Sequence, residues 1–202
     1  MLRVICLLIS VAVLASSLSV RAAPLTLKEG EALMGRFEQA RYLRGFDKPI
    51  RSSGEFFLLP KDALIWQTET PFDSRMVIDK EGLSQGMNGA EVTRLGFKQF
   101  PAFKLLRDTL ENSLSGNWAP LEEMAGTKLQ PSEEQFSLRF SPKDSGLSLP
   151  FAYLNFRISD FLDVMEIVKS NGDRDVITFT DQRIAPVETV SEAERAARKK
   201  RS

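Results

Sequence analysis

The side chains best suited to chemistry are scarce in this chain of 202 residues. It contains no histidine, and its single cysteine is Cys6, close to the start. Imidazole and thiolate provide most nucleophile–base pairs and most nitrogen or sulfur metal ligands. The sequence also lacks a phosphate-binding loop of the form G-x-x-x-x-G-K-[ST], so any source of energy must be a partner. We therefore expect no catalytic residue, no metal site and no cofactor.

Paired carboxylates are the remaining chemical candidates, because two acidic side chains can hydrolyse a glycosidic bond. Glu122 and Glu123 form one such pair, and Glu133 and Glu134 form another. Adjacent residues of a strand point to opposite faces, and both pairs lie near glycine or proline in predicted loops. We interpret them as solvated charges and predict that the protein is not an enzyme.

The first 22 residues have the pattern of a signal peptide. Arg3 provides the positive start, residues 4–14 the apolar stretch and residues 20–22 a cleavage site. That stretch is too short to span a bilayer, and no later segment is long and uncharged enough to do so. We predict export to the periplasm, cleavage near Ala22 and one domain over residues 23–190. Without Cys6 the mature chain can form no disulfide, so a hydrophobic core must stabilise it.

The mature chain is nearly neutral. Removing Arg3 and Arg21 from the 27 basic residues leaves 25 against 27 acidic ones, a net charge of −2. This balance predicts no nucleic-acid partner. The last segment, residues 191–202, gathers five basic residues: Arg195, Arg198, Lys199, Lys200 and Arg201. We interpret it as a flexible, solvated tail; contact with anionic lipid headgroups or an acidic partner is the alternative.

A strongly apolar hairpin dominates the first half of the chain. Residues 55–59 and 63–68 flank a turn made by Pro60, Lys61 and Asp62. A loop centred on Lys61 and Asp62 predicts two facing pairs, Leu59 with Leu64 and Phe57 with Trp66. The opposite face then carries Phe56, Leu58 and Ile65. Because a hairpin that is apolar on both faces must be covered on both or curve around something, we predict a wrapped sheet.

Two helices are predicted outside this hairpin. Thr26 and Glu29 have capping-box spacing and begin a helix over residues 26–37, which places Leu27, Met34 and Phe37 on one face. Pro101 begins a second, amphipathic helix. Its apolar residues recur at helical spacing and are Phe103, Leu106, Leu110 and Leu114.

Strands are predicted for most of the remaining chain. Residues 37–44 and 75–79 have strand patterns, and residues 83–92 form a weak stretch broken by glycine. After Trp118 we expect strands alone. Residues 136–140 and 152–158 alternate between apolar and polar side chains, and an Asn171-Gly172 turn predicts a hairpin that ends at residues 176–180.

Phenylalanine is used far more often than tyrosine, at fourteen residues against two. This gives aromatic area with few hydroxyl groups to satisfy, which suits contact with acyl chains. For each single phenylalanine, however, an ordinary position in a hydrophobic core is the better explanation.

Several features, taken in order, resemble the LolA family of periplasmic lipoprotein carriers. They are an N-terminal helix after a signal peptide, Phe37-x-Gln39, Gly54 before an apolar strand, a turn with proline, an apolar residue two positions before Trp66, Pro71 and the segment MVIDKEGL. This order covers nearly the whole mature chain. The resemblance implies a mostly β fold: an incompletely closed antiparallel β-barrel whose concave apolar surface is covered by an α-helical lid.

The resemblance also implies a cargo, partners and site residues. Acyl chains of a lipoprotein enter the cavity of a monomeric carrier. An inner-membrane release complex supplies the cargo, and an outer-membrane receptor accepts it. The cavity-lining aromatic position of the family falls on Leu64. We expect a lipid-binding wall of Phe57, Leu59, Leu64, Trp66, Met76 and Ile78, and a lid that includes Phe103, Leu106 and Leu110.

The sequence departs from the family at the turn of the hairpin. The family has a basic residue before the turn proline, which bonds to the lid, whereas this chain has Lys61 after Pro60. Lys61 is therefore the candidate gate, although it lacks the planar donors of arginine. The departure keeps two alternatives open. One is a carrier of another lipid, such as a polyene or glycolipid, that works with a membrane exporter; the other is a periplasmic adaptor that carries nothing.

Overall fold

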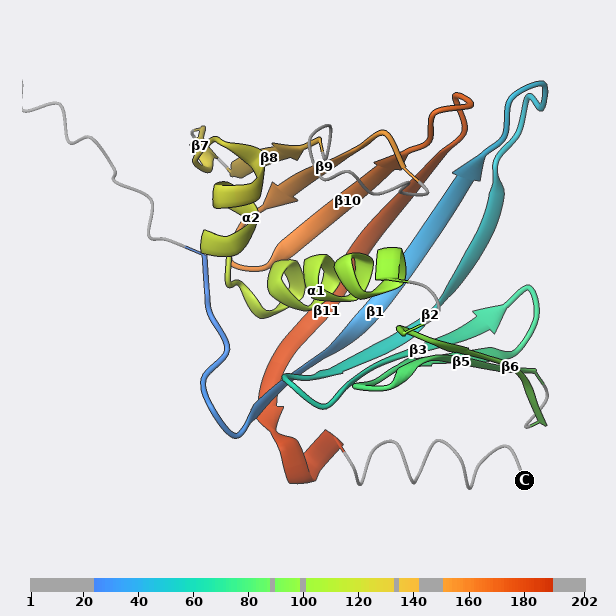
Figure 1. Cartoon of the computed structure of the whole chain (residues 1–202), viewed down its shortest axis with the longest axis horizontal. Helices are drawn as coiled ribbons and strands as arrows, with labels where there is room; N and C mark the ends of the chain where they lie inside the picture. Colours follow the sequence, from blue (N-terminus) through green and yellow to red (C-terminus); the bar gives the residue numbers. More distant parts are fainter. Residues whose placement is uncertain (1–23, 88–89, 99–100, 133–134, 142–150, 191–202) are drawn as a thin grey trace, which may run out of the picture.

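A computed structural model describes residues 24–87, 90–98, 101–132, 135–141 and 151–190 (Figure 1). The strands are β1 (Glu31–Tyr42), β2 (Ile50–Leu59), β3 (Ala63–Thr70), β4 (Ser74–Ile78), β5 (Gly82–Met87), β6 (Ala90–Gly96), β7 (Gln130–Pro131), β8 (Phe136–Phe140), β9 (Tyr153–Ile158), β10 (Leu162–Val168) and β11 (Arg174–Pro186). The helices are α1 (Pro101–Ser115) and α2 (Ala119–Ala125).

All eleven strands belong to one antiparallel sheet. Their order is β6-β5-β4-β3-β2-β1-β11-β10-β9-β8-β7, so β1 and β11 join the two halves of the chain at the centre. The edges β6 and β7 do not pair with each other, and the sheet curves around α1 (Figure 1). The expected fold class, a mostly β, incompletely closed antiparallel barrel with covering helices, is confirmed.

The prediction of a helix over residues 26–37 is wrong. Residues 24–28 have no regular structure, a turn follows at Glu29 and Gly30, and β1 begins at Glu31. Gly30 has a φ of +79°, a left-handed conformation that ends the segment before β1. Met34 and Phe37 lie on opposite faces of β1, and both are buried. Because both faces of this strand are covered, its apolar residues do not alternate with polar ones, and the pattern imitates a helix.

The hairpin of β2 and β3 is confirmed, but its predicted register is wrong by one residue. Leu58 lies opposite Leu64, and Phe56 lies opposite Trp66. The connecting loop has three residues, because Lys61 adopts a left-handed φ of 64° and the amide of Asp62 donates to the carbonyl of Leu59. A shift of one residue moves every side chain of β2 to the other face.

The second half of the chain matches the expectations more closely. The helix beginning at Pro101 is confirmed as α1, and the weak stretch after residue 83 forms β5 and the start of β6. The strands at 136–140 and 152–158 and the hairpin around Gly172 are also present. The expectation of strands alone after Trp118 is wrong, since α2 follows at once. This short helix ends at Gly126, which has a left-handed φ of 64°.

Some expectations concern parts of the chain outside the described residues. These are the signal peptide, the basic tail at 191–202 and the acidic pair at 133–134. Within the described residues, no helix combines the length and the apolar character needed to cross a membrane.

The core is divided between the two faces of the sheet. A larger cluster lies on the inner face, against α1 and α2. A smaller cluster lies on the outer face of β1, β2 and β3, where Val187 and Val190 pack after the end of β11. We call these the inner cluster and the outer cluster. The central strands are therefore buried on both sides, as the two-faced apolar hairpin predicts.

Gly54 allows the close approach of β2 and β3. A Cβ atom at this position would lie 1.9 Å from the backbone oxygen of Gln67, which cannot move away as a flexible side chain could. At Gly96, by contrast, the nearest atom to an added Cβ is the oxygen of Glu81 at 3.9 Å.

We therefore expect Gly54→Ala to destabilise the protein by about 1–3 kcal/mol through overpacking. In a domain of this size this lowers the melting temperature by roughly 3–10 °C. Gly96→Ala, measured alongside by thermal denaturation, should change it little. Equal melting temperatures for the two variants would contradict the close packing of β2 on β3.

Candidate apolar binding site

Four aromatic rings form the centre of the inner cluster. They come from four adjacent strands and are Phe37, Phe56, Trp66 and Phe179. The ring centroids of Phe37 and Trp66 lie 4.1 Å apart, and Phe56 and Phe179 meet edge to face at 5.3 Å. The Phe37 and Trp66 rings are tilted by 34°, whereas the edge-to-face contact of Phe56 with Phe179 is one of the favourable arrangements of aromatic pairs. The four rings form a dense aromatic surface in the middle of the curved sheet.

Gly35 makes room for this aromatic group. It lies opposite Phe56 in the pairing of β1 with β2, and an added Cβ would lie 2.8 Å from the Phe56 ring. The β1–β11 register shifts between Met34 and Arg36, at the same place. The packing of the Phe56 ring therefore explains the glycine at position 35.

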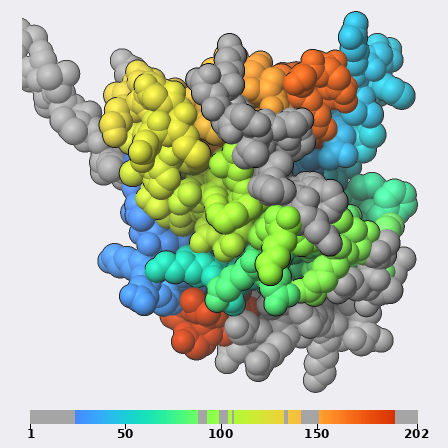
Figure 2. All heavy atoms as spheres, in the orientation of Figure 1, coloured from blue at the N-terminus to red at the C-terminus, as the bar shows by residue number. Residues whose placement is uncertain are grey.

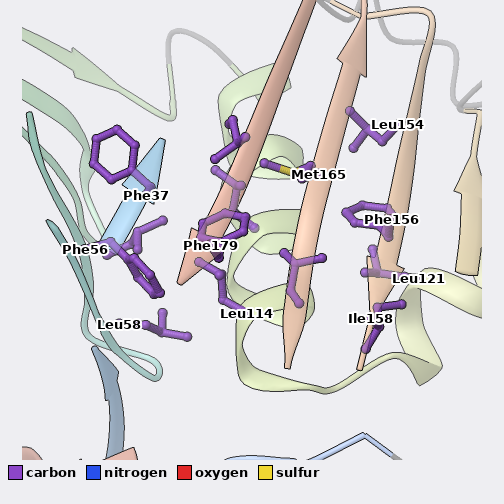
Figure 3. Close-up of a cluster of buried hydrophobic side chains, with 14 of the residues drawn as sticks. Phe37, Phe56, Leu58, Leu114, Leu121, Leu154, Phe156, Ile158, Met165 and Phe179 are labelled. Atoms are coloured by element: carbon purple, nitrogen blue, oxygen red, sulfur yellow. The ribbon is translucent and has the colours of Figure 1, made fainter. Parts of the chain in front are cut away.

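The other half of the sheet extends the apolar surface. Figure 3 shows side chains of β1, β2 and β11 and side chains of β9 and β10 in one cluster with residues of the two helices. From β9 and β10 come Leu154, Phe156, Ile158 and Met165, each at most 1% exposed. The strand pattern predicts this face, because Phe136, Leu138 and Phe140 alternate with exposed or partly exposed residues.

The predicted wall residues divide between the two faces of the sheet. Leu64, Trp66 and Ile78 belong to the inner cluster, and Met76 packs against it. Phe57 and Leu59 do not: they lie in the outer cluster with Ile65. The register error explains this correction, since the side chains that accompany Trp66 on the inner face are Phe56 and Leu58.

The inner apolar surface is covered by α1. Leu110 and Leu114 of this helix are buried in the inner cluster, and the helix contacts β2, β5 and α2. In the space-filling view, α1 (green) lies across the middle of this face of the molecule, and α2 lies beside it at the upper left (Figure 2). Of the three predicted lid residues, Leu110 is buried against the wall. Phe103 and Leu106 lie on α1, and their side chains are outside the described set.

A polar contact links the C-terminal half of α1 to the turn of the β2–β3 hairpin. The backbone amide of Lys61 donates to the carboxylate of Glu111, at 2.7 Å between nitrogen and oxygen. The same carboxylate accepts a bond from Arg107 at 3.1 Å, one helical turn earlier. The predicted gate residue therefore meets the helix through its main chain. Its left-handed φ of 64° belongs to the turn that holds this amide.

The C-terminal end of α1 is anchored by the segment before β1. The amide of Leu27 donates to the carbonyl of Ser115, and the hydroxyl of Thr26 donates to the carbonyl of Gly116. Gly116 has a φ of +74°, and a Cβ there would lie 1.9 Å from the oxygen of Leu25. Thr26, predicted as a helix cap for its own segment, instead satisfies the end of another helix.

Three buried side-chain polar atoms have no hydrogen-bond partner within the described residues. They are the indole nitrogen of Trp118, the hydroxyl oxygen of Thr109 and the side-chain oxygen of Gln182, and of these residues Trp118 belongs to the inner cluster. Trp118 is 6% exposed, and its ring meets Phe156 edge to face at 5.6 Å. A buried donor without an acceptor is costly, so the indole N–H is available to an acceptor on a bound molecule.

The apolar surface ends in a charged group towards the β1–β2 loop. Asp175 is buried and accepts from Arg41 at 2.7 Å, and its second oxygen lies 3.1 Å from the Lys169 ammonium. Burial opposes the charged form of Asp175, but the bonds from Arg41 and Lys169 outweigh it and lower the pKa of the carboxyl. Gln39, Arg41 and Asp175 follow Phe37 and Ile177 on the inner face, so this face is apolar at one end and polar at the other.

The carboxylate of Glu122 is held by two neighbouring residues, Leu129 and Lys128. The carboxylate accepts from the amide of Leu129 at 2.8 Å and lies 3.0 Å from the ammonium of Lys128. The backbone bond from Leu129 is the main reason that the pKa of Glu122 is lowered. Glu122 and Glu123 lie on α2, not in a loop as predicted. Within the described ranges, no three histidine, cysteine, aspartate or glutamate residues come together as a metal site.

Comparison with solved structures finds chains that resemble this one in fold. The chain is similar to the crystal structure of a LolA superfamily protein from Nitrosomonas europaea. The TM-score is 0.42 and the sequence identity 9%, over 77% of this chain and 87% of that one. No protein-family model matches the sequence, and neither does any curated protein.

Proposed function

We propose that this protein is a periplasmic carrier that binds the acyl chains of lipoproteins between α1 and the inner face of the sheet. It shuttles them from the inner to the outer membrane. The observation that carries the proposal is a continuous apolar surface covered by a helix, which is tied to the β2–β3 turn by one polar contact among the side chains that the structure describes. The role of Leu64, Trp66, Met76 and Ile78 as wall residues belongs to this proposal.

The energetics of an acyl chain suit this arrangement. Each buried methylene contributes about 0.8 kcal/mol, so a dozen methylenes contribute roughly 10 kcal/mol before other costs. Leu110 and Leu114 contribute about 1.5–3 kcal/mol each by occupying the same surface. The incoming chain must displace them, and its apparent affinity falls by that amount. This competition keeps the cargo releasable.

Opening of the helix is expected to pivot at its anchored end. Ser115 and Gly116 are held by the segment before β1, whereas Glu111, one turn earlier, holds α1 at the Lys61 amide. Breaking the Glu111 contact frees α1 without disturbing its C-terminal anchor. The exposed inner surface then accepts the acyl chain, and the indole N–H of Trp118, which has no partner in the described structure, donates to an ester or amide carbonyl of the cargo.

The first test uses the two tryptophans of the chain, both of which lie in the inner cluster. A brominated acyl chain quenches tryptophan fluorescence only on close contact. We expect a dibrominated stearoyl probe to quench Trp66 in a Trp118→Phe variant. The matched control carries its one tryptophan on the outer face, as Phe57→Trp with Trp66→Phe and Trp118→Phe, and should be quenched little. Equal quenching in both proteins would contradict binding at the inner face.

The second test concerns the Glu111 contact. Glu111→Ala removes a bond to a charged acceptor that contributes about 1 kcal/mol at this partly exposed site. The closed state is then less favoured, so affinity for the brominated probe should rise about five-fold. Asp108→Ala is the control, because it removes the ion pair with Lys104 on the same helix at an exposed position. If folded Glu111→Ala binds the brominated probe with unchanged or lower affinity, the helix and the cargo do not compete for the inner surface.

The third test identifies the cargo by native mass spectrometry of protein purified from the periplasm of its own host. We expect a bound lipoprotein that leaves on activation. A bound lipid below about a kilodalton, such as a polyene ester or glycolipid, would keep the binding site and change the cargo. A protein that is reproducibly empty and also refuses the brominated probe would favour the adaptor alternative.

A further inference from the structure

The most exposed large apolar side chains in the described ranges lie on two loops at one end of the sheet. Phe46 in the β1–β2 loop and Phe72 in the β3–β4 loop are each 71% exposed, and Ile50 at the start of β2 is 56% exposed. The register places both loops at the same end, since Arg41 pairs with Ile50 and Ser53 with Thr70. Figure 1 shows the two tips projecting on the same side of the molecule. We call these two loops the rim.

The rim combines these apolar tips with basic side chains. Arg44, Lys48 and Arg51 flank Phe46 and Ile50 in sequence, and all three are exposed. None of the salt bridges found in the described structure includes them. Asp47 is the single acidic residue between Arg44 and Arg51. The β1–β2 loop and the residues beside it therefore carry a net positive charge around Phe46.

The β1–β2 tip is held in position by its neighbours. The amide of Arg44 donates to the carboxylate of Asp173 in the β10–β11 turn, at 2.9 Å. Below it, the guanidinium of Arg174 lies 4.3 Å from the centre of the Tyr42 ring. These contacts join two hairpins at their ends, so Phe46 is presented on a supported tip.

We propose that the rim docks on the surface of an anionic lipid bilayer. Separate aromatic tips do not form the contiguous flat patch typical of a protein interface. They suit a soft surface, into which apolar side chains enter to the boundary of headgroups and acyl chains. Arg44, Lys48 and Arg51 then meet lipid phosphates, as basic residues do at anionic membranes. The nearby Arg41–Asp175–Lys169 group brings the polar end of the inner face to the same side.

Docking goes beyond acyl binding, because it concerns where the protein meets a membrane and not what it holds. It also gives the carrier an orientation. The polar end of the inner face is turned towards the bilayer, whereas the anchored end of α1 and α2 faces away (Figure 1).

The experiment is sedimentation of the chain from Ala23 onward with sucrose-loaded vesicles of phosphatidylcholine containing 30 mol% phosphatidylglycerol. We expect binding that weakens strongly on pure phosphatidylcholine. Phe46→Ser and Phe72→Ser should each reduce the partition constant about ten-fold, and Lys48→Gln about five-fold. The matched controls are Met124→Ser, an exposed apolar residue on α2, and Lys28→Gln, an exposed lysine before β1; both should bind like the unaltered chain.

A further variant, Phe46→Trp, reports insertion directly. Its added fluorescence should shift to the blue on anionic vesicles, with no shift on neutral ones. Rim variants that bind vesicles as well as the unaltered chain would overturn the proposal, and this is the result expected if the rim serves a protein partner or if the basic tail alone binds lipid. Equal binding to neutral and anionic vesicles would overturn it too.

Failure of docking and failure of acyl binding are distinguishable. Affinity for the brominated acyl probe in solution should be unchanged in Phe46→Ser and Phe72→Ser, because neither residue lies in the inner cluster. Loss of vesicle binding with normal probe binding supports the rim. If these variants lose both vesicle binding and probe binding, the proposal that the rim acts separately from the acyl site is overturned.

Discussion

The structure depends on the burial of apolar side chains on both faces of β1, β2 and β3. Phe37, Phe56 and Trp66 lie on the inner face, and Met34, Phe57 and Ile65 lie on the outer face. A sheet with one wet face needs one cover, but these strands need two. The residues that follow β11 pack on the outer face, and α1 with α2 packs on the inner one. The position of both covers follows from this requirement.

The two covers differ in how firmly they are attached. Val187 and Val190 directly follow β11, so the outer cover begins as an extension of a central strand. The inner cover includes a separate helix, α1, which is joined at its end to the segment before β1 and, one turn earlier, to the β2–β3 turn. Under the proposed function, the inner cover is the one that an apolar cargo replaces. In the proposed carrier, the helix and the cargo compete for one surface, which limits affinity and permits release.

The two ends of the inner face also differ in chemical character. At one end, α2, the C-terminus of α1 and the segment before β1 close the inner face. At the other end the inner face becomes charged at Arg41, Asp175 and Lys169, and the hairpin tips extend past it. Long central strands produce this asymmetry, because β1 and β11 have 12 and 13 residues, whereas β4 and β9 have 5 and 6. The docking surface that we propose uses the extended end.

Much of the fold could be predicted from residue patterns, and the failures share a cause. Strands β8 and β9 were predictable because each has one polar face, and α1 because its apolar residues recur with a period of 3.6. The β2–β3 hairpin was predictable as a pair of apolar runs around Pro60. β1 was mistaken for a helix because burial on both faces removes the alternation that identifies a strand. The helix α2, with seven residues and no side-chain cap, gives too short a pattern to detect.

The sequence by itself determined that this protein has an apolar, two-sided sheet with a covering helix and few groups for catalysis. It did not decide which side chains of β2 face inward, because that choice rests on the left-handed conformation of one residue, Lys61, and a single-residue shift reverses every face. Nor did it decide what holds the helix. The contact joins Lys61 and Glu111, which are fifty residues apart, and only the tertiary structure brings a backbone amide of a turn to a carboxylate of α1. The spacing of apolar residues is a local property of the sequence, whereas strand register and long-range polar contacts are fixed only when the elements pack together.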